Sequence, residues 1–348
     1  MTDLALRRPV GPGTRTVSGP RRRLIGLIVA LAVLLGLLVA SMMIGSTAIA
    51  PTVVWDALVH PSNDIDQFAI RDFRLPRTVV GLVVGMALGV SGALIQALTR
   101  NPLADPDILG LNAGASFAVT VAVGLLGVRD IQSYMWFAFA GALIVTLVVL
   151  ALGSTRRGQS PVMMVLAGVC VGAVFRGAGS ALELTNPDAF DAIRSWNAGS
   201  IVSRPLDLLW PTLLFFAIAL LLAFAVSGPL NAMALGDELA VAQGVRLARS
   251  RILAIIALTL LAGGATAIAG PIGFVGLMVP HVARWIVGPD QRWIFAYSAL
   301  LGPILLLASD ILGRVVMRPG EIPVGIVTAF VGAPVLIALV RQKKASGL

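Results

Sequence analysis

Long hydrophobic runs, interrupted by short stretches of Pro, Gly and charged residues, dominate the chain. A transmembrane helix needs about 20 mostly apolar residues, and dividing the chain at its polar interruptions yields ten such segments. They cover residues 24–44, 75–98, 108–127, 132–152, 161–182, 208–226, 250–269, 272–287, 293–313 and 323–341. The pattern predicts an all-α, polytopic membrane protein of about ten transmembrane helices.

The composition points the same way. Of the 348 residues, 57% are hydrophobic and only 12% are charged, with a mean hydropathy of +0.93. This number of polar groups is too small to cover the surface of a soluble globular protein. Lipid is therefore the expected solvent. Residues 1–20, rich in Arg, Pro and Gly, are predicted to form a disordered cytoplasmic arm. Residues 21–348 are predicted to form one transmembrane domain.

The distribution of basic residues predicts the orientation. With the amino terminus placed in the cytosol, 17 Lys and Arg fall on the cytosolic side, 8 fall outside, and Arg176 lies within a segment. The positive-inside rule therefore favours an even number of spans with both termini in the cytosol. The net charge of +9 is scattered between the hydrophobic runs without a basic stripe, so no nucleic-acid partner is expected.

A weak internal similarity links SGALIQ at residues 91–96 with IGFVG at 272–276. With ten segments, it suggests two five-helix halves, as in many transporters. The most informative connection is the cytosolic segment at about 229–250. It predicts a short helix that begins near Asp237 and ends at Gly244, and a second one leading into Arg249. On spacing alone, a plain amphipathic connector and a contact site for a partner remain equally open.

Few ionisable residues fall within the predicted spans: Arg176, Glu183, His281, Arg284 and Asp310. Glu183 and Asp310 are expected at span ends, Arg284 is expected to extend towards the cytosol, and His281 is expected to be a hydrogen-bonded structural residue. A proton-driven carrier would be expected to bury a carboxylate in mid-span, and none is evident. The lone Cys170 is predicted to be a small core residue, and no metal site is expected.

Nucleotide chemistry is not expected on this chain. No phosphate-binding loop is present, and the only lysines are Lys343 and Lys344. Any energy from a nucleotide must therefore come through a partner, and we predict neither an enzyme nor a bound cofactor. At the outer end of the second span, Arg74 and Arg77 flank a rigid Leu-Pro. They are suited either to anchoring the helix at head-group level or to binding a partner's carboxylates.

Several motifs together resemble the FecCD/BtuC family of permeases, the membrane subunits of type II ABC importers for iron-siderophores, haem and cobalamin. They are Arg-Leu-Pro-Arg at 74–77, SGALIQ at 91–96, RNPLADPDILG at 100–110, the segment 234–244, GPIGFVGLMVPHVAR at 270–284 and RPGEIPVGIVTA at 318–329. The resemblance extends from the first span to the last and excludes only the amino-terminal arm.

The resemblance implies a BtuC-like permease fold, working with a second permease subunit, two ABC ATPases that use ATP and Mg²⁺, and an extracytoplasmic binding protein. It assigns ATPase coupling to Asp237, Glu238, Ala240 and Gly244, binding-protein docking to Arg74, Arg77 and Arg314, and the cytosolic gate to Asn101 and Leu103. The second permease is a related chain or another copy. The implied location is the cytoplasmic membrane of a bacterium.

The implied function is import of a ferric-siderophore-type chelate by alternating access, with cobalamin or haem as alternatives within the family. Two other classes are weighed against it. An ion-coupled secondary transporter would need no nucleotide-binding partner, and a non-transporting membrane scaffold would need no coupling segment.

Overall fold

All ten predicted membrane segments are helices. The computed structural model describes residues 19–45, 47–60, 64–155, 158–159 and 161–343, so the predicted arm lies outside it apart from its last two residues. The ten helices are α1 (Pro20–Met43), α4 (Leu75–Thr99), α5 (Leu111–Gly124), α6 (Ile131–Gly153), α7 (Pro161–Thr185), α9 (Leu209–Ala234), α11 (Leu247–Ala269), α12 (Val275–Val287), α13 (Gln291–Val316) and α14 (Val324–Lys343). Within the described residues, seven are long and apolar enough to cross a membrane, while α5, α12 and α14 contribute shorter apolar stretches.

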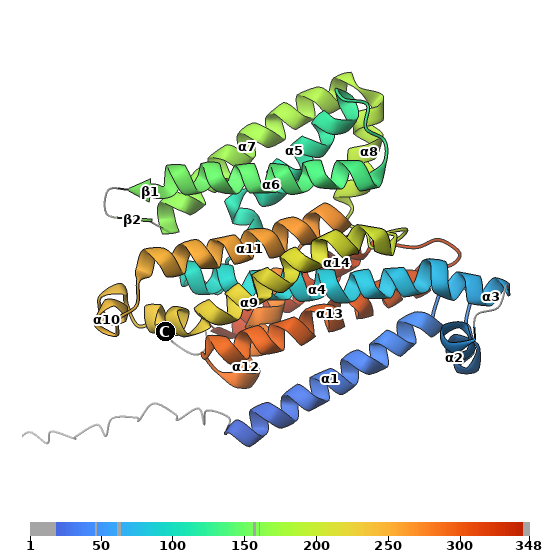
Figure 1. Cartoon of the computed structure of the whole chain (residues 1–348), viewed down its shortest axis with the longest axis horizontal. Coiled ribbons are helices and arrows are strands. Elements are labelled where there is room, and N and C mark those ends of the chain that lie inside the picture. The colour runs from blue at the N-terminus through green and yellow to red at the C-terminus, as the bar shows by residue number, and fades with distance from the viewer. Residues whose placement is uncertain (1–18, 46, 61–63, 156–157, 160, 344–348) are drawn as a thin grey trace, which may run out of the picture.

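The largest difference from the predicted limits is at α9, which continues through Pro229 to Ala234 instead of ending at residue 226. The fold is all-α, as predicted, apart from a hairpin of two-residue strands, β1 (Ser154–Thr155) and β2 (Gly158–Gln159), between α6 and α7. Figure 1 shows the hairpin and α10 (Asp237–Ala242) at one end of the bundle. At the opposite end lie α2 (Pro51–Val59), α3 (Ile65–Phe68) and α8 (Pro187–Asn197).

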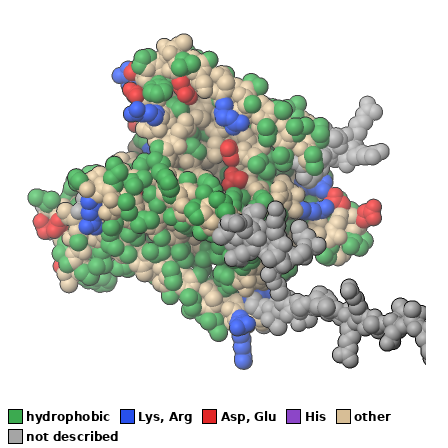
Figure 2. All heavy atoms as spheres, turned by 180° about the vertical axis from the view of Figure 1, so that it is seen from behind, with side chains coloured by type: hydrophobic (Ala, Val, Ile, Leu, Met, Phe, Trp, Pro, Cys, Tyr) green, Lys and Arg blue, Asp and Glu red, His purple; other side chains and the backbone are tan. Residues whose placement is uncertain are grey.

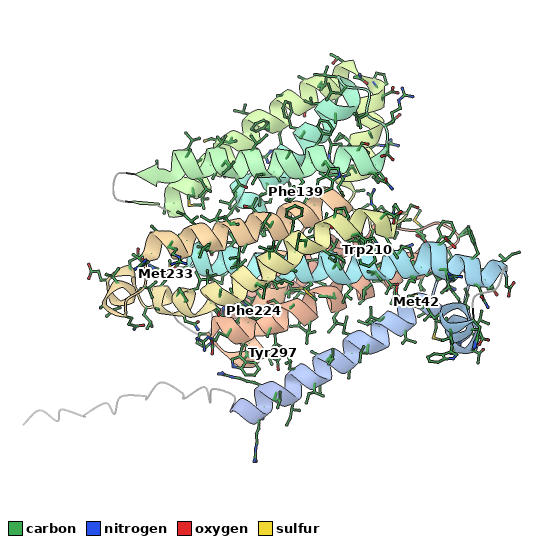
Figure 3. The ribbon with its side chains drawn as sticks, viewed as in Figure 1. Met42, Phe139, Trp210, Phe224, Met233 and Tyr297 are labelled. Atoms are coloured by element: carbon green, nitrogen blue, oxygen red, sulfur yellow. The ribbon has the colours of Figure 1, made fainter. Side chains whose placement is uncertain are left out.

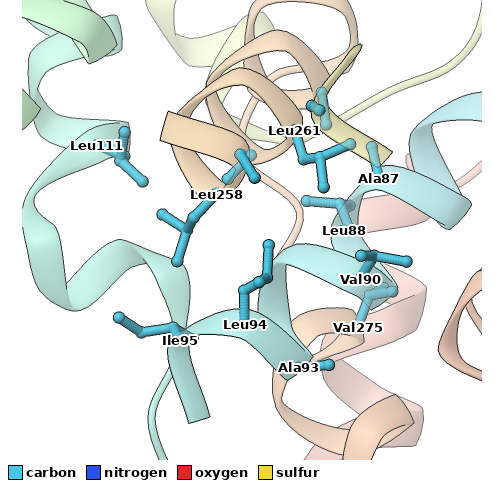
Figure 4. Packing of buried hydrophobic residues seen from close by; sticks show 14 of the residues in the cluster. Ala87, Leu88, Val90, Ala93, Leu94, Ile95, Leu111, Leu258, Leu261 and Val275 are labelled. Atoms are coloured by element: carbon cyan, nitrogen blue, oxygen red, sulfur yellow. The ribbon is translucent and has the colours of Figure 1, made fainter. Parts of the chain in front are cut away.

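Helices α4 and α11 pack against each other at the centre of the bundle, where their Leu and Val side chains interdigitate (Figure 4). Helix α4 also packs on α12 and α13, and α11 packs on α5 and α6. Each central helix is followed by a break in the helical backbone, over residues 100–110 or 270–274, and then by one of the short helices α5 and α12. In chain order, the two predicted five-helix halves correspond to α1 with α4–α7 and to α9 with α11–α14, and helices of the two pack against each other throughout the bundle.

The two segments with similar sequences, 91–96 on α4 and 272–276 at the start of α12 and just before it, are in contact: a Cβ on Gly92 would lie 1.9 Å from the carbonyl oxygen of Gly276. Both sequences are rich in small residues because two helix backbones meet there, which is a common reason for glycine in membrane helices.

Aromatic side chains fill the layers between the helices further from the centre. Phe139 of α6 reaches towards α11, and Phe224 of α9 packs edge-on against Phe295 of α13 with 6.2 Å between ring centroids (Figure 3). Such pairs add specificity to an otherwise apolar contact.

The outer faces of the helices are hydrophobic. In Figure 2, hydrophobic side chains cover the broad middle of the face, and most of the visible charged side chains lie towards the ends of the bundle. Cys170 belongs to such a face: it is exposed on α7, so its assignment to the core is wrong. In a membrane protein an apolar position does not distinguish core from lipid or partner contact, because all three are apolar.

Of the ionisable residues expected within the spans, Arg284 differs from expectation, whereas Asp310 and His281 lie where a span end and a structural residue were expected. Asp310 lies inside α13 and is only 1% exposed, so a buried carboxylate is present, although near the end of its helix. Arg284 does not extend outwards but donates to Oε1 of Gln96 at 3.1 Å. His281 is buried and packs edge-on against Trp285, 5.2 Å between ring centroids.

Candidate docking, gating and coupling sites

Arg74, Arg77 and Arg314 come together at the end of the bundle that carries α2 and α3. Arg74 ends the short π-helical segment η1 (Ala69–Arg74), Arg77 lies in the first turn of α4, and Arg314 lies in the last turn of α13. Their side chains are almost fully buried. The sequence places two of them close together, but only the fold adds the third.

Asp310 holds two of these arginines together. Arg77 donates from Nε to both carboxylate oxygens of Asp310 at 3.0 and 3.1 Å and from Nη2 at 2.7 Å. Arg314 donates to the same carboxylate from Nε at 2.9 Å and also from Nη2. A second carboxylate, Glu321, accepts from Nη1 of Arg77 at 2.6 Å. A buried charge needs such a partner, so these carboxylates fix the guanidinium groups in place.

The other donors of Arg74 and Arg314 cap the carboxyl end of α1. Arg74 Nη1 donates to the carbonyls of Met42 and Met43 at 2.8 and 2.9 Å, and Arg314 Nη1 donates to that of Ser41 at 2.8 Å. The last carbonyls of a helix lack intrahelical partners and favour cations. The arginines therefore have a structural role within this chain, whatever they also bind.

A cavity of about 360 Å³ opens beside the cluster. Its lining includes all three arginines, Glu321, and residues of the segments that follow α1 and α8. Side-chain relative exposure is 32% for Glu321 and 8% for Arg77. The more accessible carboxylate of the cluster is therefore Glu321, which pairs with Arg77 in the lining of the cavity.

At the opposite end, α10 runs from Asp237 to Ala242, with Gly236 (φ +121°) before it and Gly244 (φ +82°) after it. The prediction that the helix begins at Asp237 and stops at Gly244 is confirmed. The second short helix is wrong, because residues 247–251 form the first turns of α11. Ala240 is fully buried, whereas Glu238 is exposed.

Two apolar side chains of α10 also point outwards: Leu239 and Val241 are 55% and 56% exposed. They flank the buried Ala240, so the helix is fixed to the bundle on one side and presents a mixed apolar and acidic surface on the other.

Asp237 connects three elements at this end. Its Oδ2 accepts from Nη2 of Arg251 on α11 at 2.6 Å, and its Oδ1 accepts from Nη2 of Arg100 at the end of α4. Partial burial opposes ionisation, but the hydrogen bonds from Arg251 and Arg100 outweigh it and hold the pKa of Asp237 below its usual value. The first residue of α10 is thus tied to both central helices.

Arg100 ends α4 in the left-handed conformation (φ +51°), and the predicted gate residues follow directly. Asn101 Oδ1 accepts from the backbone N–H of Leu103 at 3.0 Å, which closes a tight turn. Leu103 is 47% exposed. The predicted gate residues and the predicted coupling helix therefore lie on either side of a single ion pair, Arg100 with Asp237.

The sequence reasoning missed the partners of these groups. It placed Asp310 near a span end without giving it a partner, and it did not consider Glu321, Arg100 or Arg251 as ion-pair partners. The available signal was balance of charge, since buried arginines require nearby carboxylates. Within the described parts of the chain, no three His, Cys, Asp or Glu side chains are grouped as a metal site would require.

A bundle of ten apolar helices with its polar clusters confined to the ends is a multi-pass membrane protein. Comparison with known proteins gives the family: the model of the FecCD transport family matches residues 32–342, and the chain belongs to that family. It is therefore a transport permease, and the predicted FecCD/BtuC-type permease fold is confirmed.

The relatives agree. The chain is 48% identical to the ferric enterobactin transport system permease protein FepD of Escherichia coli, over 88% of this chain and 92% of that protein. It is 37% identical to the probable siderophore transport system permease protein YfiZ of Bacillus subtilis, over 91% and 95%. A solved inward-facing structure of a metal-chelate type ABC transporter has a TM-score of 0.80 at 27% identity, covering 92% of this chain and 99% of that one.

Proposed function

We propose that this chain carries a ferric-siderophore-type iron chelate across the cytoplasmic membrane of a bacterium, as the permease subunit of an ABC importer. The observation that carries the proposal is the 48% identity to a ferric enterobactin permease over nearly the whole length of both chains. Haem or cobalamin is the alternative cargo. The proposed complex contains a second permease subunit, two ATPases that hydrolyse ATP with Mg²⁺ and an extracytoplasmic binding protein. Both termini then face the cytosol.

In this proposal the binding protein docks over the cavity beside Arg74, Arg77 and Arg314. Carboxylates on the binding protein are suitable partners because a guanidinium binds them in a bidentate manner. The guanidinium of Arg77 is already paired with two carboxylates of this chain, those of Asp310 and Glu321. A docking carboxylate must therefore displace the half-exposed Glu321 from Arg77, while Asp310 remains in place beneath.

At the cytosolic end, an ATPase acts on the exposed face of α10, which carries Glu238, Leu239 and Val241. The ion pair between Asp237 and Arg100 passes the movement of α10 to the turn at Asn101 and Leu103. Because this turn directly follows α4, a displacement of α10 moves the predicted gate without any change inside the membrane.

The deciding experiment is reconstitution of the permease with its natural partners in lipid vesicles. We expect ATP-dependent uptake of a radiolabelled ferric chelate that vanadate blocks and that collapse of the ion gradient leaves intact. The reverse pattern would identify an ion-coupled transporter instead. Parallel assays with haem and cobalamin test the alternative cargo.

Coupling is tested in the same vesicles with Asp237→Asn and Glu238→Gln, with Asp188→Asn on the opposite end as the matched control. Chelate-stimulated ATPase activity and uptake are expected to fall several-fold in the first two and to stay unchanged in the control. Asp237→Glu, which keeps a carboxylate for both Arg100 and Arg251, is expected to retain part of the uptake. A scaffold without transport would show no stimulation in any variant.

A further inference from the structure

Arg176 is a charged residue that belongs to neither of the polar clusters at the two ends of the bundle. It lies near the middle of α7 (Pro161–Thr185), its side chain is exposed, and no carboxylate of the described residues is within ion-pair distance. Its guanidinium folds back along the helix: a Cβ on Gly172 would lie 3.3 Å from Nη1. The absence of a side chain at Gly172 leaves the space that the guanidinium occupies.

The position of Arg176 near the middle of a transmembrane helix indicates whether its side chain faces lipid or water. An arginine at the centre of a membrane helix costs about 2.5–3.5 kcal/mol when it meets lipid, and such residues normally face water or protein. The residues on either side along the same face are small, namely Ala173, Gly177 and Ser180, and they too are exposed. An exposed face with a cation, small side chains and the hydroxyl of Ser180 is suited to an aqueous path and not to lipid.

Arg176 also lies close to the segment that leads away from the predicted gate. About two turns earlier on α7, Gly168 is packed against the carbonyl of Ile108 and the backbone of Leu109, in the short helix η2 (Pro106–Leu109). The charges of Arg176 and Asp107, also in η2, are near enough to interact. The guanidinium therefore lies near the loop that contains Asn101 and Leu103, on the side of the membrane interior.

We propose that Arg176 lines the transport path and contacts anionic cargo, so that this permease favours negatively charged ferric chelates, such as those with catecholate or carboxylate ligands, over neutral trihydroxamates. The inference rests on the proposed function and adds the charge class of the cargo. A guanidinium matches paired anionic oxygens. A single cation gives a weak site that the cargo can leave, as transport requires.

The test uses the complete complex in vesicles, with Cys170→Ser as the parent so that this chain has no other thiol. Arg176→Cys is made on this parent and labelled either with a thiosulfonate that attaches a trimethylammonium group or with one that attaches a sulfonate. The measurements are the labelled fraction, uptake of a radiolabelled ferric tris-catecholate, and basal ATPase activity. Arg176→Lys is the conservative variant.

We expect both charged reagents to label the cysteine, which reports contact with water. Uptake should fall about tenfold in Arg176→Cys, the loss typical of one charge-assisted hydrogen bond. It should recover with the cationic label or in Arg176→Lys and fall further with the sulfonate, while basal ATPase activity stays constant. This pattern supports a contact with anionic cargo and excludes a purely structural role.

Two results overturn the inference alone: a cysteine that neither reagent labels, or uptake that is the same with both labels. A joint loss of uptake and basal ATPase activity also overturns it, since it assigns Arg176 to assembly. If the parent itself imports no ferric chelate, the proposed function fails, and this inference fails with it.

Discussion

Asp310→Asn tests whether the buried arginine cluster holds the outer end of the bundle together. The substitution preserves the size of the side chain but removes its charge and turns one acceptor oxygen into a donor that faces a guanidinium. Asp310 is 1% exposed and accepts from both Arg77 and Arg314. Two buried cations thus lose their shared counter-charge.

The loss of stability is estimated from the contacts that Arg77 and Arg314 keep in the variant. Removing one partner of a buried ion pair costs about 3–5 kcal/mol. Arg77 keeps its contact with Glu321, and Arg314 keeps the carbonyl of Ser41, so the lower value of about 3 kcal/mol applies here. At roughly 1.4 °C per kcal/mol for a chain of this size, the melting temperature should fall by about 4 °C.

The assay is thermal unfolding of the purified permease in detergent, followed by intrinsic tryptophan fluorescence. Asp188→Asn is the matched control, because Asp188 forms an exposed pair with Arg129 at 2.6 Å, with side chains 63% and 79% exposed. Exposed pairs contribute little, so this control should melt like the wild type. Equal melting temperatures for the two variants would refute the reasoning, since burial would then make no difference.

Three further predictions concern packing, pH and docking. Gly92→Ala places a Cβ 1.9 Å from a backbone oxygen of α12 and should lower the melting temperature by several degrees, whereas Gly36→Ala, with nothing within 4 Å, should not. Burial raises the pKa of Asp105 to about 6, so its contribution to stability is fully present below about pH 4 and is lost as the pH rises through 6. Asp105→Asn should flatten this part of the melting profile between pH 4 and 7.5. Glu321→Gln removes the charge that competes for Arg77 and should make the binding protein dissociate several-fold more slowly, as measured by surface plasmon resonance.

Each of these has an outcome that contradicts it. Equal melting temperatures for the two alanine variants would mean that α4 and α12 are not in contact. A pH profile unchanged by Asp105→Asn would assign the pH dependence to another group. Faster dissociation with Glu321→Gln would mean that Glu321 assists docking instead of competing with it.

The local sequence was sufficient to predict the position and limits of helices that depend on local backbone preferences. The ten spans, the start of α10 at Asp237 and its end at Gly244 were all predictable, because apolar length, helix-dipole preference and a glycine at positive φ are local properties. The same approach could not orient the helices about their own axes. Cys170 illustrates this, since apolar residues face both lipid and core, and the periodicity that marks a buried face in soluble helices is absent.

By itself, then, the sequence determined the fold class, the number of spans and, through its motifs, the family. Only the tertiary structure decided which polar groups meet: Arg77 with Asp310, separated by 233 positions, and Arg100 with Asp237, separated by 137. The physical reason is that a buried charge is stable only beside its counter-charge, and no local pattern records which distant carboxylate the packing of helices will bring to it.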